Sequence, residues 1–172
     1  MIAQPMRFKG EYVGDLLVDD CDGWLLNEHK WRPLKRARNL GFYVITDIGD
    51  WRERYRTKYI HRLIMNAPRG MEVDHINGDT FDNRRSNLRL CTHAENARNL
   101  RTSKQGSSRF RGVYWHTCRQ NWMARIRNTY LGSFKSETAA ALAFDRAADE
   151  LFGEFRGPRN LPRCEGNQLT LF

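Results

Sequence analysis

The chain lacks a long hydrophobic run. None of its apolar segments approaches the roughly 20 residues that a membrane-spanning helix needs. Residues 1–7 also lack the hydrophobic region that is typical of a signal peptide. We therefore expect no membrane association and a location in the cytoplasm.

Cysteine is scarce and scattered. The four cysteines stand at positions 21, 91, 118 and 164 and form no Cys-x-x-Cys pair. This spacing argues against a structural zinc site and against a disulfide framework. We expect free thiols that are mostly packed.

Acidic residues are absent between Asn96 and Ser136. The whole chain carries 29 Lys and Arg against 20 Asp and Glu, a net charge of +9. The acid-free segment holds nine bases, with aromatic residues between them: Arg98, Arg101, Lys104, Arg109, Arg111, Arg119, Arg125, Arg127 and Lys135, with Phe110, Tyr114, Trp115, Trp122 and Tyr130. A solvated basic face would normally include acids. The pattern therefore favours a nucleic-acid-binding surface.

A length of 172 residues with 40% apolar composition suits one ordinary domain or two small ones. In the first part, turn signals separate short apolar stretches. They predict strands at 15–18, 23–26, 40–46 and 55–60, then a short helix at 60–66. Two basic stretches, 30–38 and 52–62, could contact phosphates or lie on a solvated strand surface, and both interpretations stay open.

The middle of the chain has sharper local signals. A strand at 71–74 leads into the turn residues Asn77-Gly78-Asp79, and a second strand should carry residues 88–90. Thr92 and Glu95 then have the spacing of a capping box, which predicts a helix from His93 with Asn96 in its first turn. The expected order is strand, loop, strand, helix.

Phosphodiester hydrolysis needs a cation for the leaving oxygen and a base for the attacking water. The hard oxygen ligands of Asp74 and Asn96 suit magnesium or manganese, and His75 can accept a proton near neutral pH. Adjacent strand residues point to opposite faces, so the strand must twist or end there. Taken alone, Asp74 and His75 could be turn chemistry, and Asn87 could cap a loop.

The residues in 61–64, 72–79, 82–89 and 95–96 together resemble the His-Asn-His (HNH) endonucleases, in particular the homing-endonuclease branch. The resemblance implies a ββα-metal fold in which Asp74 and Asn96 bind one divalent ion. Mg²⁺ is expected first and Mn²⁺ second. His75 would be the general base and Asn87 would brace its loop. His93 could replace a ligand, although its position at the helix start favours exposure, and His61 is expected to pack or anchor.

The basic segment continues as three strands of alternating character, at 108–115, 122–127 and 130–134. Ser136 should then cap a helix that ends at Gly153. The apolar positions of this helix recur every three or four residues, at Ala140, Phe144, Ala147 and Leu151. Its other face should carry Asp145, Asp149 and Glu150 and turn away from DNA.

This second part, with residues 139–148 and 160–162, resembles the apetala-two or ethylene-response-factor type of DNA-binding domain. The resemblance implies a three-stranded sheet that lies in the major groove. Base preference does not carry over, because Tyr114, Arg125 and Tyr130 differ from the plant pattern. The residues implied to face DNA are Arg109, Arg111, Tyr114, Trp115, Arg125, Arg127 and Tyr130. Packing is favoured for Phe110, Phe134 and Phe144.

The expected fold class is α+β. N-terminal strands lead into an HNH nuclease module within residues 1–100, a linker follows at 101–107, the DNA-binding domain occupies 108–162, and a tail ends the chain. We expect a metal-dependent DNA endonuclease that binds double-stranded DNA and nicks it as a monomer, in the host-cell cytoplasm if it is phage-encoded. No obligatory protein partner is evident. The alternatives are a non-catalytic DNA-binding regulator with a decayed nuclease fold, and a binder of structured RNA.

Overall fold

The computed structural model describes residues 1–36, 41–49, 56–99 and 106–162. It divides into two compact units, unit 1 (Met1–Asn99) and unit 2 (Leu100–Phe172). Helices combine with antiparallel strands in both, which confirms the predicted α+β class. The predicted tail and most of the linker, residues 101–105, lie outside the described residues, so the predicted domain boundaries stay a prediction.

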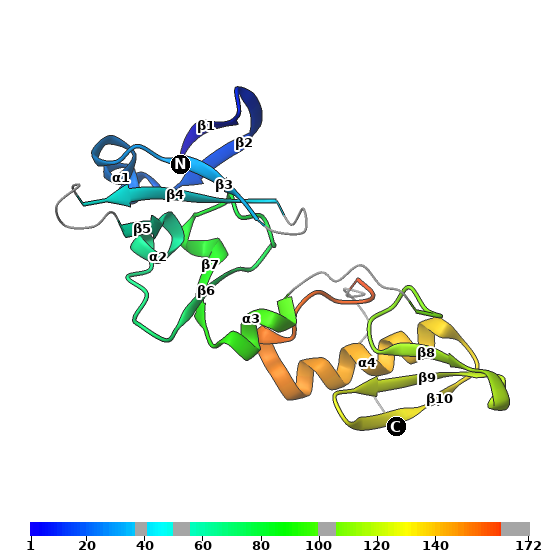
Figure 1. The fold of residues 1–172 in the computed structure, drawn as a ribbon. Coiled ribbons are helices and arrows are strands. Elements are labelled where there is room, and N and C mark those ends of the chain that lie inside the picture. The colour runs from blue at the N-terminus through cyan, green and yellow to red at the C-terminus, as the bar shows by residue number, and fades with distance from the viewer. Residues whose placement is uncertain (37–40, 50–55, 100–105, 163–172) are drawn as a thin grey trace. The chain divides into compact units, whose positions relative to one another are not determined.

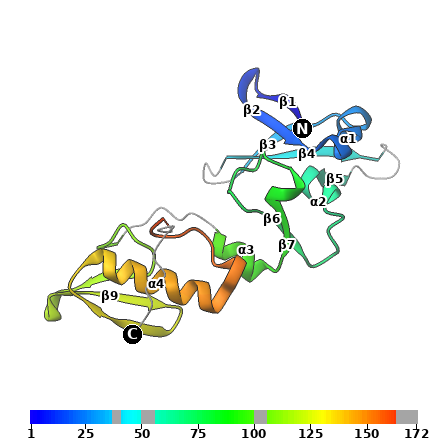
Figure 2. The same cartoon turned by 180° about the vertical axis from the view of Figure 1, so that it is seen from behind.

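Unit 1 contains seven strands and three α-helices among its described residues. In chain order the elements are β1 (Ile2–Phe8), β2 (Glu11–Val18), η1 (Asp20–Asp22), α1 (Trp24–Glu28), β3 (Arg32–Lys35), β4 (Phe42–Ile48), β5 (Arg56–Tyr59), α2 (Ile60–Ile64), β6 (Glu72–His75), η3 (Arg85–Asn87), β7 (Leu88–Cys91) and α3 (His93–Asn99). Figure 1 and Figure 2 both show the sheet β3-β4-β5 between the β1–β2 hairpin and the part made of α2, β6 and β7.

One hydrophobic core joins the N-terminal strands of unit 1 to the part around β6 and β7. Its buried members come from nearly every element of the unit: Met6, Leu16, Val18, Leu25, Trp31, Val44, Ile60, Ile64, Val73 and Leu88. Leu17 also pairs with the loop after β6, because its N–H donates to Phe81 O and its carbonyl accepts from Asn83 N. Residues 60–99 therefore share their core with the N-terminal strands and do not form a separate module.

The structure corrects two of the expectations for residues 1–60. Residues 23–26 were expected as a strand but lie mostly in helix α1, because a short apolar run fits either a helix or a strand. Strands β1 and β3 were not expected, and each contains a proline, Pro5 or Pro33. Proline is tolerated there because both are edge strands. The strands at 15–18, 40–46 and 55–60 are confirmed within the described residues as parts of β2, β4 and β5.

Unit 2 is a three-stranded antiparallel sheet covered by one long helix. The elements are β8 (Val113–His116), η4 (Thr117–Arg119), β9 (Asn121–Ile126), β10 (Thr129–Phe134), α4 (Glu137–Phe152) and η5 (Gly153–Phe155), with β9 central. Ser136 Oγ accepts from Ala139 N at the start of α4, and Gly153 with φ of 51° follows its end. Both predicted helix limits are thus confirmed.

Two core clusters fix α4 to the sheet. One contains Phe110, Val113, Ala124, Ala140 and Ala141, and the other is centred on Phe144. Gly112 has φ of 73°, and a Cβ there would lie 2.1 Å from the Phe144 ring. Only glycine therefore allows the ring to pack at this point.

The prediction that Asp145 lies on the outer face of α4 is wrong. Its carboxylate is 1% exposed and accepts hydrogen bonds from the backbone N–H groups of Asn160 and Leu161. These bonds satisfy the buried charge and tie the segment after η5 to the helix. Asp149 pairs instead with Arg156 and Arg159.

The expectation of mostly packed thiols is also wrong for the described cysteines, since Cys21 and Cys118 are exposed and only Cys91 is buried. Burial raises the pKa of the Cys91 thiol to about 11. Within the described ranges, no helix has the length and apolar character that crossing a membrane would require.

Candidate active site

The β6–β7 hairpin and helix α3 hold most of the predicted site residues. In the antiparallel pairing of β6 with β7, Asp74 pairs with Arg89 and His75 pairs with Leu88. The capping box at the start of α3 is confirmed, because Thr92 N donates to Glu95 Oε2 and Glu95 N donates to Thr92 Oγ1. This cap fixes where α3 begins beside the two strands.

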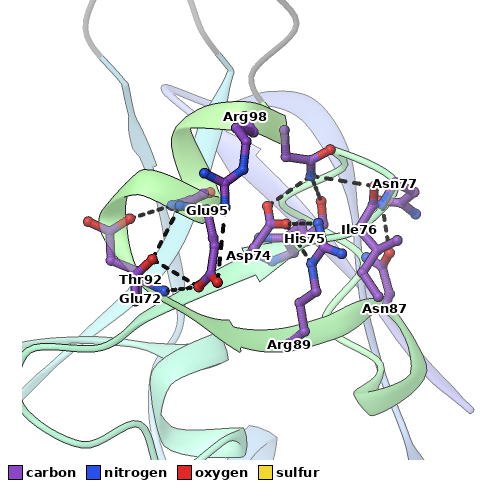
Figure 3. Close-up of polar contacts among 12 residues, drawn as sticks. Glu72, Asp74, His75, Ile76, Asn77, Asn87, Arg89, Thr92, Glu95 and Arg98 are labelled. Atoms are coloured by element: carbon purple, nitrogen blue, oxygen red, sulfur yellow. Dashed lines mark hydrogen bonds and ion pairs between the residues drawn. The ribbon is translucent and has the colours of Figure 1, made fainter. Parts of the chain in front are cut away.

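Asp74 lies at the centre of a polar cluster. Its carboxylate is almost fully buried. Arg89 donates to Oδ2 from Nε at 2.9 Å and from a terminal nitrogen at 2.6 Å, and Asn99 Nδ2 donates to Oδ1 at 2.8 Å. Figure 3 shows Asp74 directed at Arg89 and α3. The same Asn99 nitrogen lies 2.8 Å from the His75 carbonyl.

His75 is the last residue of β6, so the strand ends where a site shared with Asp74 requires it to end or twist. The His75 ring is also buried. Its Nε2 lies 3.2 Å from Asn83 Oδ1, and its ring meets the His61 ring at a centroid distance of 5.1 Å. Burial lowers the pKa of His75, and the Asn83 hydrogen bond and the Asp74 charge oppose this in part. The imidazole is therefore neutral at neutral pH and can accept a proton.

Asn87 braces the loop that follows His75. Its Oδ1 accepts from Asn77 N at 3.0 Å, and its Nδ2 donates to Asp82 O at 2.8 Å. Its backbone carbonyl accepts from Ile76 N at 2.9 Å. Asp82 is in turn held by Arg84 through two bonds of 2.7 Å. The loop therefore has little freedom next to the imidazole.

Asn96 is on α3, but its amide contacts a different carboxylate. Its Nδ2 donates to Glu72 Oε2 at 2.6 Å, and His93 Nδ1 lies 2.8 Å from Glu72 Oε1. These two contacts lower the pKa of Glu72. The His93 side chain is 88% exposed, as its place at the helix start predicted.

The structure thus brings Asp74 and His75 to the end of one strand, with Asn87 on the adjoining loop. It places the Asn99 amide, not that of Asn96, against Asp74. Sequence patterns did not indicate Asn99, Arg89, Glu72 or Asn83. Two of them had a readable signal: Asn99 follows Asn96 at helical spacing, and Glu72 shares a strand face with Asp74.

The predicted ligands form an oxygen set of one carboxylate and one amide. Within the described residues there is no group of three or more His, Cys, Asp and Glu side chains arranged to hold a metal. The Asn96 contact with Glu72 is made by the amide nitrogen and not by the oxygen. The Asn96 side chain contacts the carboxylate of Glu72, which lies on β6 two residues before Asp74.

The basic stretch at 52–62 is partly structural. Arg62 donates to the carbonyls of Met71, Ala67 and Pro68 at 2.7, 3.2 and 3.1 Å. It therefore holds the loop before β6 rather than facing solvent. Residues 37–38 and 52–55 of the two basic stretches lie outside the described residues.

In unit 2, three predicted DNA-facing residues share the outer face of the sheet. Val113 and Ala124 pair across β8 and β9 and pack under α4. Side chains alternate along a strand, so the next residues, Tyr114 and Arg125, point away from the helix. Tyr130 pairs with Arg125 and is 52% exposed.

The other four predicted DNA contacts each lie against an aromatic ring of unit 2. Arg111 lies 5.2 Å from the Phe144 ring and donates to Arg156 O, and burial lowers its pKa. Trp115 pairs with Trp122 on the side that faces α4. Arg127 lies 5.0 Å from the Phe152 ring, and Arg109 lies 4.8 Å from the ring of Phe110. Among the predicted DNA contacts, Tyr114, Arg125 and Tyr130 share the face of the sheet that points away from α4.

Comparisons with known proteins give a family model and several similar proteins. A family model described as HNH endonuclease matches residues 58–98. An uncharacterized HNH endonuclease of Acanthamoeba polyphaga mimivirus is 31% identical over 159 residues, which are 88% of this chain and 79% of the viral protein. Protein 3.8 of Escherichia phage T7 is 34% identical over 59 residues, which are 34% of this chain and 49% of that protein.

A further similarity is to APETALA2-like protein 2 of Oryza sativa subsp. japonica. It is 37% identical over 91 residues, which are 46% of this chain but only 21% of the rice protein. No solved structure matches the chain.

Proposed function

Because the chain belongs to the HNH endonuclease family, we propose that it is a metal-dependent nuclease of the homing type that nicks one strand of duplex DNA. The family makes it an enzyme that hydrolyses DNA. It is part of the proposal that the enzyme is of the homing type, that it cuts one strand, that it needs a metal ion and that unit 2 binds DNA. A monomer in the cytoplasm remains our expectation.

The environment of His75 carries the proposal. Asn83 Nδ2 donates to the carbonyls of Thr80 and Phe81 at 3.1 and 3.0 Å, so its Oδ1 is the atom that faces His75. An amide oxygen only accepts, which requires the proton of the neutral imidazole to be on Nε2. The lone pair is then on Nδ1. A neutral and oriented imidazole is what a general base requires.

Asp74 and Asn96 are the proposed ligands of the divalent ion, with Mg²⁺ preferred to Mn²⁺. Both offer hard oxygen atoms, which fit these ions. When bound, the ion would neutralise charge on the leaving oxygen. Asn96 can retain the hydrogen bond from its Nδ2 to Glu72 while its amide oxygen binds the ion. Asn87 holds the loop that follows His75 and so keeps the base in a fixed position relative to Asp74 on β6.

Unit 2 is proposed to fix the enzyme on DNA. Its sheet surface of Tyr114, Arg125 and Tyr130 combines a cation with aromatic faces, and the name of the rice relative supports a DNA-binding module of the apetala-two type. A tethered binding unit raises the local concentration of the nuclease at DNA without new contacts at the cut.

Nicking of supercoiled plasmid tests the proposal. We expect Mg²⁺-supported conversion to the open circle by the wild type, inhibition by EDTA, and no activity in His75→Ala. Competition with duplex DNA and with structured RNA should show preference for the duplex. A His75→Ala variant that nicks normally would disprove the assignment of the base. Duplex binding without any nicking would fit the non-catalytic regulator.

A further inference from the structure

The imidazole of His75 is held by two groups. Asn83 contacts its Nε2, as described above, and His61 contacts its ring. The His61 and His75 rings meet edge to face, with an interplanar angle of 76° at 5.1 Å. Asn83 therefore selects the tautomer, whereas His61 restricts the plane of the ring.

His61 is itself fixed by aromatic packing. It is 7% exposed and lies 5.6 Å from the ring of Tyr43 and 5.5 Å from that of Tyr59. The two tyrosines also meet edge to face at 5.5 Å. Tyr43 belongs to β4 and Tyr59 to the end of β5. The ring contacts thus connect the N-terminal sheet with His75.

A hydrogen bond from Nδ1 does not explain a histidine at this position. The Nδ1 of His61 is buried and has no hydrogen-bond partner among the described residues, and an unpaired buried polar atom costs stability. Burial lowers the pKa of His61 to about 3, with the neighbouring His75 as a smaller cause. The residue is therefore a neutral ring held by packing, which adds no positive charge beside His75.

We propose that His61 is a positioning residue for the general base. Its ring, set by Tyr43 and Tyr59, keeps the plane of His75 in the orientation that aims Nδ1 at the attacking water. This inference rests on the proposed role of His75 as the base. It assigns a catalytic purpose to the N-terminal sheet, which lies almost entirely outside the residues that match the family model.

Two substitutions of similar size test the idea. His61→Phe keeps a flat ring and removes the nitrogens, whereas His61→Leu fills the space without a ring. We expect His61→Phe to nick plasmid with kcat within about threefold of the wild type, and His61→Leu to lose at least about tenfold in kcat with an unchanged KM for DNA, because small misplacements of a catalytic group are costly. His29→Leu is the control, since His29 meets the Trp31 ring edge to face and no other ring among the described residues.

Long-range ¹H–¹⁵N NMR spectra of the imidazole nitrogens supply a readout that is independent of cleavage. The wild type and His61→Phe should show a single Nε2–H form of His75, and His61→Leu should show a broadened or averaged signal in a chain that still unfolds cooperatively. Equal kcat values and equal His75 spectra in His61→Phe and His61→Leu would overturn the inference. If His75→Ala itself nicked DNA normally, the assignment of His75 as the base would fail instead, whatever the NMR spectra of the His61 variants show.

Discussion

Arg89 and Asp74 form a buried ion pair on facing strands, with side chains that are 11% and 4% exposed and a shortest contact of 2.6 Å. Removing one member of such a pair leaves an uncompensated buried charge. We expect Arg89→Met to lower the free energy of unfolding by about 3–5 kcal/mol. Urea unfolding followed by circular dichroism measures this.

The exposed pair Arg32–Asp47 is the matched control. It has the same kind of contact at 2.7 Å, but its side chains are 54% and 34% exposed. Solvent screens such a pair, so Arg32→Met should leave the urea midpoint close to that of the wild type. Equal effects of the two substitutions would contradict the importance of burial at Asp74.

Removal of divalent ions should stop nicking without unfolding the protein. Asp74 already has a charged partner in Arg89 and an amide partner in Asn99, so the fold does not need a cation to balance this carboxylate. This differs from a structural zinc site, whose loss unfolds the domain. We expect the same melting temperature with and without EDTA. A large drop in that temperature with EDTA would indicate a structural metal.

Substitutions of Asn83 should separate its two roles. Asn83→Leu removes both the acceptor for His75 and the donors to Thr80 and Phe81, whereas Asn83→Asp removes the donors alone. Both should lose about 1–3 kcal/mol of stability through the unpaired carbonyls, but Asn83→Asp should retain the higher kcat. A carboxylate there also raises the pKa of His75. The acid limb of its kcat–pH profile should therefore move to higher pH.

His61 should make the protein less stable in mild acid. Its pKa is 6.5 as an ordinary histidine and about 3 in the fold, so between these values only the unfolded chain binds the proton. Stability is fully present above pH 6.5 and falls as the pH drops, by about 1.4 kcal/mol per pH unit. Unfolding free energies from pH 7 downward should fall less steeply in His61→Phe. Parallel curves for both proteins would show that His61 is protonated in the fold.

Signals that act over a few residues predicted their structures well. The capping box of Thr92 and Glu95, the cap at Ser136 and the glycine after α4 are all found, because each depends on hydrogen bonds within one turn. The strand prediction for residues 23–26 was wrong, because their conformation depends on burial of Leu25 in the shared core. No local rule separates a helix from a strand in so short a run.

Several contacts of the candidate site depend on the tertiary structure and could not be predicted from local sequence patterns. Asp74, His75 and Asn87 could be chosen from the resemblance to the HNH endonucleases, and the structure places them around one loop. The contacts of Asn83 and Arg89 depend on how the loop after His75 folds and on the register between β6 and β7. His61 illustrates the same limit: the sequence predicted that it packs or anchors, but only the fold shows that it packs against His75.

The sheet surface of unit 2 leads to a prediction about salt. Arg125 is exposed beside Tyr130 on the face away from α4, whereas Arg146 is exposed on α4 itself. If the sheet meets DNA, each cation that neutralises a phosphate contributes about 0.9 to the slope of log K against log salt. In the full chain carrying His75→Ala, Arg125→Ala should reduce that slope by about one such step and weaken binding. Arg146→Ala should leave it unchanged, and the reverse result would place DNA on the helix side of unit 2.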